Sequence, residues 1–249
     1  MAAAPPSRRR AILPGDRLVL LVALGGLAAL SWAWLWFAPM PMPAVAGGLH
    51  SGRYAVLTFL MWFVMMIGMM LPAVAPTVLL FDRVNQRDRD SAGRTPPFLL
   101  GYLTVWLVFS VLATALQVAL IGAGWIDEMG VLTERRATVV LLVAVGVYQW
   151  LPIKGVCLRR CQAPAQFLVA AFRPGRLGAL QMGLRHGVYC LGCCWALMLL
   201  LFVGGVMNLL WVAALAGLVL FEKLLATGNG WRLASGAVAL AAAGALAMR

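Results

Sequence analysis

The chain has 249 residues, of which 63% are apolar and 11% are charged, and its formal net charge is +12. A soluble globular domain carries roughly 25% charged residues, so this composition excludes that class and indicates a membrane protein. Anionic lipid headgroups account for the basic excess, and no nucleic-acid partner is expected. Because the connections are short, we expect residues 1–249 to form one integral membrane domain, which begins with a basic cytoplasmic tail at residues 1–17.

Apolar segments long enough to cross a hydrocarbon core of about 30 Å recur along the chain. Lipid cannot hydrogen-bond to the backbone, so such segments are expected to be helical. We predict an all-α fold, a polytopic helical membrane bundle of about seven transmembrane helices. They fall at about residues 18–37, 56–81, 98–122, 137–152, 179–203, 207–225 and 231–248.

Basic residues are concentrated on alternate connections, which decides the orientation by the positive-inside rule. The segments placed inside include Arg8 to Arg10, four arginines between residues 83 and 94, and Lys154, Arg159 and Arg160. The segments placed outside hold far fewer. The N-terminus is therefore predicted to be cytoplasmic.

The segment at 56–81 contains the methionine-rich run MWFVMMIGMMLP. Helical spacing places Met61, Met65 and Met69 on one face, with Met66 and Met70 on the adjoining face. Methionine can simply fill gaps in a core. Its thioether is also a ligand for Cu(I), so Met65, Met69 and Met70 are candidate metal ligands.

Between the segments at 137–152 and 179–203, Pro152, Pro164 and Pro174 are expected to interrupt helices, leaving a short amphipathic helix at the cytoplasmic face. This region contains CLRRC, in which Cys157 and Cys161 are four residues apart and share a helical face. The two thiols could bind Cu(I) or form half of a zinc site, or they could be unreactive. Because they lie nearer the cytoplasm, we expect a site separate from the one described next.

The segment at 179–203 carries HGVYCLGCCW. His186, Cys190, Cys193 and Cys194 follow one helical face, because positions three, four and seven apart share a face. Met182 and Met198 extend this stripe by one turn in each direction. Buried cysteine is common in cores, but three Cys with one His favour a soft-metal site whose remaining ligands come from another helix.

Three charged residues lie in or near apolar segments, where charge is costly. Arg185 could reach the inner headgroups or compensate the negative charge of a thiolate-bound metal. Glu222 and Lys223 are expected at the inner interface, where headgroups would satisfy them.

The blocks MWFVMMIGMMLP, YQWLPIKGVCLRRCQAP and HGVYCLGCCWALM, the last followed by GVMNLLW and the pair EK at Glu222 and Lys223, occur in the order seen in a bacterial family of predicted metal-binding integral membrane proteins, a domain of unknown function. The chain resembles that family over about residues 55 to 225. The resemblance implies a multi-span protein of the bacterial inner membrane with a metal site, and some members are labelled as copper chaperones. It implies that the family's recurrent positions correspond here to Met65, Met69, Met70, Cys157, Cys161, Cys190, Cys193 and Cys194.

Three functions fit these features. The first is Cu(I) handling, or less favourably zinc binding, with delivery to a membrane or periplasmic protein partner. The second is membrane thiol redox chemistry by the Cys190 and Cys193 pair. The third is an auxiliary subunit of a membrane complex, in which the stripe is only core. Thioether donors favour copper, and binding is favoured over catalysis.

Overall fold

The computed structural model describes residues 14–38, 52–85, 93–226 and 228–248, so most of the predicted basic tail lies outside the described residues. The described chain is helical apart from turns and one isolated bridge between Ile126 and Leu132. The all-α fold is therefore confirmed. The helices are α1 (Pro14–Phe37), α2 (Gly52–Asn85), α3 (Thr95–Gly122), α4 (Arg135–Trp150), α5 (Pro152–Gln162), α6 (Pro164–Ala171), α7 (Gly175–Leu199), α8 (Leu201–Gly204), α9 (Leu209–Leu224) and α10 (Gly230–Ala247).

Proline and asparagine determine where several helices begin. Helices α5 and α6 begin at Pro152 and Pro164, and Pro174 is the residue before α7, as the sequence indicated. Proline is tolerated in a first helical turn because its missing N–H has no partner there. Asn208 caps α9, since its side-chain oxygen accepts a hydrogen bond of 3.2 Å from the Trp211 amide.

The number of membrane-spanning helices differs from the predicted seven. Among the described residues, five helices are long and apolar enough to cross a membrane, and a sixth span results if α4 and α5 are counted as one broken span. Helix α4 ends after 16 residues because the chain bends by 63° where α5 begins. Helix α9 also has 16 residues, which is about 24 Å of helix and shorter than the hydrocarbon core.

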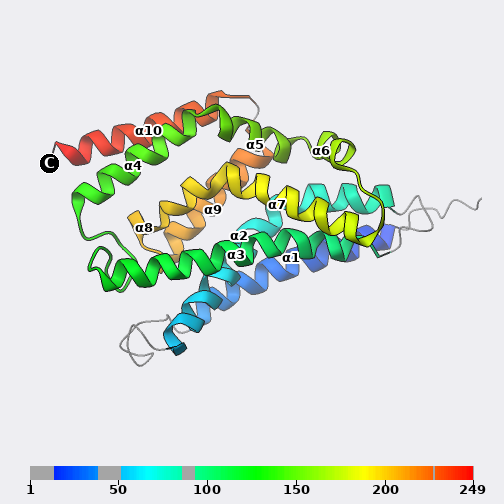
Figure 1. Ribbon diagram of the computed structural model, residues 1–249, viewed down its shortest axis with the longest axis horizontal. Helices are drawn as coiled ribbons and strands as arrows, with labels where there is room; N and C mark the ends of the chain where they lie inside the picture. Colours follow the sequence, from blue (N-terminus) through cyan, green and yellow to red (C-terminus); the bar gives the residue numbers. More distant parts are fainter. Residues whose placement is uncertain (1–13, 39–51, 86–92, 227, 249) are drawn as a thin grey trace, which may run out of the picture.

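The helices form a layered bundle in which α7 and α9 lie between two groups (Figure 1). Helices α1, α2 and α3 form one group, and α4 packs along α10 in the other. Helix α7 packs most closely against α3 and also contacts α5. Bulky side chains at this centre, including Trp62, Tyr102 and Trp106, are almost completely buried.

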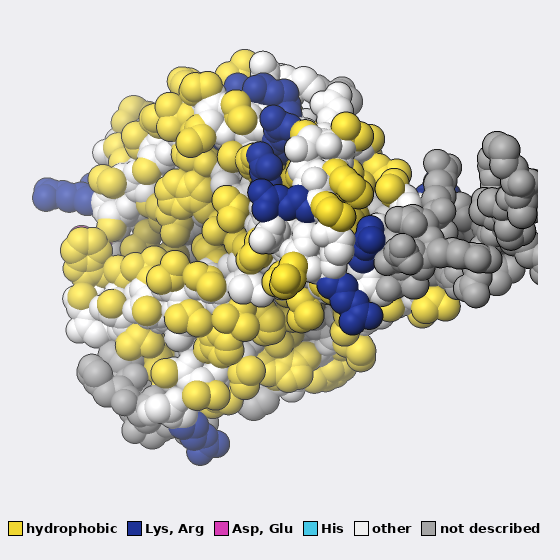
Figure 2. Space-filling model, turned by 45° about the vertical axis from the view of Figure 1, so that its right-hand side comes forward, with side chains coloured by type: hydrophobic (Ala, Val, Ile, Leu, Met, Phe, Trp, Pro, Cys, Tyr) yellow, Lys and Arg dark blue, Asp and Glu magenta, His cyan; other side chains and the backbone are white. Residues whose placement is uncertain are grey.

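The outer surface is largely apolar. Leu30 on α1, Val140 on α4 and Val238 on α10 are each about two-thirds exposed. Figure 2 shows apolar side chains over much of one face, crossed by a band of Lys and Arg. An apolar exterior bordered by basic residues is what a bilayer requires.

Candidate metal centre

The four residues of the α7 stripe lie on the buried face of that helix. His186, Cys190, Cys193 and Cys194 are each at most 2% exposed, and Met182 and Met198 above and below them are also buried. All four predicted ligands therefore point into the bundle.

The three α7 thiols cluster around one turn of backbone. The thiols of Cys193 and Cys194 both donate to the Cys190 carbonyl oxygen, at 3.1 and 3.0 Å. The Cys190 sulfur lies 3.1 Å from the Tyr102 hydroxyl, which comes from α3. All five cysteines of the chain are free thiols, so these sulfurs remain available to a soft cation.

Cys161 joins this cluster from another helix. Its thiol interacts with the thiols of Cys190 and Cys193. Cys157 sits one turn earlier on α5, against Gly192, where an added Cβ would lie 2.9 Å from the Cys157 sulfur. The expectation of a separate site nearer the cytoplasm is therefore wrong for Cys161, because the bend between α4 and α5 turns α5 onto α7.

A buried ion pair anchors α5 in that position. The Lys154 ammonium lies 2.8 Å from both carboxylate oxygens of Glu222 on α9, and it also bonds to Gln149. Gln162, at the other end of α5, donates to the backbone carbonyls of Glu222 and Ala226. The sequence expectation that headgroups satisfy Glu222 is wrong, because Lys154 and Glu222 each supply the counter-charge that allows the other to be buried.

Lys223 also points inward rather than to the headgroups. It is 4% exposed, and its ammonium lies 2.9 Å from the Cys190 sulfur and 3.6 Å from the sulfurs of Cys194 and Met70. Three soft donors from α2 and α7 therefore converge on one cation. Sequence reasoning named Lys223 but placed it at the headgroups; the signals available were a charge at the end of an apolar helix and its place in the EK pair of the family resemblance.

The methionine face of α2 is buried, but its members differ in position. Met65, Met69 and Met70 are each at most 3% exposed. Met70 reaches the thiols through Lys223, and its carbonyl accepts a 3.2 Å hydrogen bond from Tyr102. All the methionines of this face belong to the apolar core, and the Met70 sulfur contacts Lys223 beside the thiols, so Met70 is the best-placed thioether.

His186 lies in an aromatic cage one turn below Cys190. The rings of Phe98, Tyr102 and Phe167 have centroids 4.8 to 6.2 Å from its imidazole. Its buried Nδ1 has no hydrogen-bond partner among the described residues. An unpaired buried nitrogen is costly, and this unpaired nitrogen keeps His186 a candidate ligand.

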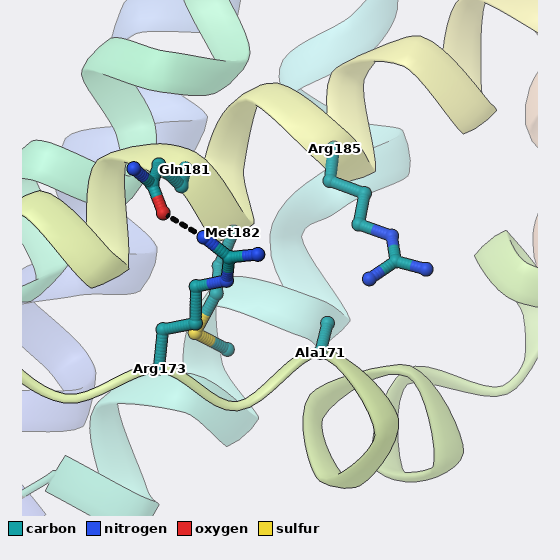
Figure 3. Close-up of a pocket in the computed structure, with 5 residues that line it drawn as sticks. All are labelled: Ala171, Arg173, Gln181, Met182 and Arg185. Atoms are coloured by element: carbon teal, nitrogen blue, oxygen red, sulfur yellow. Dashed lines mark hydrogen bonds between the residues drawn. The ribbon is translucent and has the colours of Figure 1, made fainter.

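Arg185 lies away from the thiols. It lines a pocket of about 120 Å³ with Met182 and Arg173. Figure 3 shows these side chains and the hydrogen bond from Arg173 to Gln181. The Arg185 guanidinium is 3.4 Å from the Tyr189 hydroxyl. The compensating charge nearest the sulfurs is thus Lys223 and not Arg185.

The donor set suits a soft monovalent metal. Thiols and a thioether favour Cu(I), and imidazole accepts copper or zinc. Within the described part of the chain, no three His, Cys, Asp or Glu side chains are already arranged to hold a metal. The Lys223 ammonium occupies the point where the sulfurs meet, so binding requires side chains to move.

Comparison with known proteins gives one family. The family model described as PpoB2, copper chaperone, matches residues 59–247. That range includes all five cysteines, His186, Met70 and Lys223. Neither the curated proteins nor the solved structures gave a match.

Proposed function

Because the chain belongs to the PpoB2 copper chaperone family, we propose that it binds Cu(I) inside a helical membrane bundle and delivers it to a membrane or periplasmic protein partner. We place it in the bacterial inner membrane with its N-terminus in the cytoplasm, following the distribution of arginines. Copper is here the cargo of the protein and not a resident cofactor.

The convergence of sulfur atoms carries this proposal. The sulfurs of Cys190, Cys194 and Met70 all lie within 3.6 Å of one cation, the Lys223 ammonium. Cys161 and Cys193 adjoin the same thiols. A buried cluster of this kind can hold a soft cation and pass it between neighbouring donors, which is the chemistry of metal delivery.

Thiol redox chemistry is the second function considered for these cysteines. It needs two thiols that can form a disulfide, and it gives no role to the Met70 thioether or to the imidazole of His186 one helical turn from Cys190. A Cu(I) site uses all of these groups. Metal binding is therefore the better account.

The test is the copper content of a triple variant, Cys190→Ser with Cys193→Ser and Cys194→Ser. Serine keeps the size of each side chain but removes the soft donor. We expect at least about a tenfold drop in copper bound by the purified, reduced protein, since changing even a supporting residue of a metal site costs about 10- to 100-fold. Equal copper in wild type and variant would refute the proposal.

A second prediction separates the two cysteines of α5. Cys161→Ser is expected to lower copper retention under a competing chelator, because its thiol adjoins Cys190 and Cys193. Cys157→Ser is the matched control, since it makes the same chemical change one turn away on the same helix. If both variants retain copper equally, Cys161 does not belong to the site.

A further inference from the structure

Lys223 is the positive charge closest to the proposed copper ligands. It lies in the last turn of α9, and its ammonium contacts the sulfurs of Cys190, Cys194 and Met70 at 2.9, 3.6 and 3.6 Å. The only hydroxyl described at the same sulfurs is that of Tyr102, 3.1 Å from Cys190. Of the three sulfurs that contact the ammonium, those of Cys190 and Cys194 are thiols and that of Met70 is a thioether.

The neighbouring carboxylate does not neutralise this charge. Glu222 precedes Lys223 but is held by Lys154, whose ammonium is 2.8 Å from both carboxylate oxygens. That buried pair is neutral by itself. The charge of Lys223 must therefore be balanced by whatever forms at the sulfurs.

Charge counting then separates monovalent from divalent metals. Each thiol that becomes a ligand loses its proton to solvent. Two thiolates with Cu(I) carry −1, and Lys223 brings the total to zero. Two thiolates with Zn(II) are already neutral, so Lys223 leaves a buried net charge of +1, which is costly in a low-dielectric interior.

From this balance we propose that Lys223 is a specificity-determining residue, which makes the site formed by Cys190, Cys194 and Met70 prefer Cu(I) over divalent metals. The inference rests on the proposed function, because it concerns the same site. Thiols alone would bind both Cu(I) and divalent ions. The inference adds that the charge of Lys223 decides between them.

The geometry allows Lys223 to keep this role when metal is bound. Metal–thiolate bonds are about 2.3 Å long, so a metal at the meeting point of the sulfurs takes the place of the ammonium. The four-carbon stem of lysine is flexible, and a small withdrawal leaves the charge beside the metal. Lysine thus occupies the site before loading and balances its charge afterwards.

The test is a competition between Cu(I) and Zn(II) for purified full-length protein, under reducing conditions, with each metal buffered by a chelator. Lys223→Gln removes the charge and keeps a polar side chain. Its Cu(I):Zn(II) binding ratio is expected to fall on the order of tenfold to a hundredfold, because the negative Cu(I) dithiolate loses its buried counter-charge and the neutral Zn(II) dithiolate does not. Arg185→Gln is the matched control and should change the ratio by less than about twofold, because its charge is away from the sulfurs.

Further variants keep the test decisive. Lys223→Leu replaces Lys223→Gln if the latter does not purify as a folded protein. Lys223→Arg retains the charge and should keep the preference for Cu(I). A third thiolate, from Cys193, would give Zn(II) a charge of −1, which Lys223 would bring to zero. The same competition in a Cys193→Ser background excludes this possibility.

The outcomes distinguish the two proposals. An unchanged ratio in the neutral variants, or an equal fall with Lys223→Arg, overturns the role of Lys223 and leaves copper binding intact. Wild-type protein that binds no more Cu(I) than the triple Cys variant overturns the proposed function, and this inference with it.

Discussion

The Gly183→Ala variant is expected to be destabilised by about 3 kcal/mol or more, because α3 and α7 are in backbone contact at this point. A Cβ at Gly183 would overlap the Phe98 carbonyl oxygen and lie 2.8 Å from its carbonyl carbon. Gly101 on α3 is in the reciprocal position, with a Cβ overlapping the Leu180 carbonyl oxygen and 2.8 Å from the Leu184 amide. Backbone atoms cannot rotate away as side chains can, so the helices must separate.

The measurement is thermal or denaturant unfolding of the purified protein in detergent. Gly217→Ala on α9 is the matched control, because nothing lies within 4 Å of the added Cβ. There the better helix propensity of alanine should give a gain of up to about 1 kcal/mol. If Gly183→Ala unfolds like Gly217→Ala, the close packing of α3 and α7 is not present in solution.

Helix separation also bears on the metal centre. Tyr102 follows Gly101 on α3, and its hydroxyl bridges the Cys190 sulfur and the Met70 carbonyl. This hydrogen bond connects α2, α3 and α7 at the sulfurs. The glycine contact therefore sets the distance between the helices that hold the proposed ligands.

Apolar runs and prolines placed the long helices, but the sequence predicted one short helix where the structure has α5 and α6, and seven spans where five or six are found among the described residues. Every predicted segment contains a helix, and helices begin at Pro152 and Pro164 as expected. The spacing of His186 and the α7 cysteines also predicted a common face, which is buried. These features follow from local periodicity, which a sequence records directly.

The contacts between helices could not be read in this way. Cys161 and Cys190 meet because α5 bends back onto α7. Lys223 contacts the sulfurs while Lys154 holds Glu222, the residue before it. Pro152 indicated a break but not the direction of the following helix. The depth of a side chain and the direction of a helix are set by the packing of several helices. The sequence therefore wrongly assigned Glu222 and Lys223 to the headgroups.

Removing the carboxylate of Glu222 is expected to destabilise the protein by about 3 to 5 kcal/mol, the usual cost of breaking a buried pair. In Glu222→Leu, the Lys154 ammonium would remain fully buried, with Gln149 as its one remaining partner among the described residues. Lys223, the residue after Glu222 on α9, has the same sign as Lys154 and cannot replace the carboxylate. The free energy of unfolding in detergent measures this loss.

A double-mutant cycle tests whether charge pairing is the cause. Lys154→Leu with Glu222→Leu removes both charges, and buried pairs replaced by apolar side chains often cost little stability. We expect the double variant to recover most of the stability lost by either single variant. It should also keep its copper, since the hydrogen bonds from Gln162 to the backbone of α9 still hold α5 beside α7. Additive losses in the cycle would mean that Lys154 and Glu222 stabilise the fold independently.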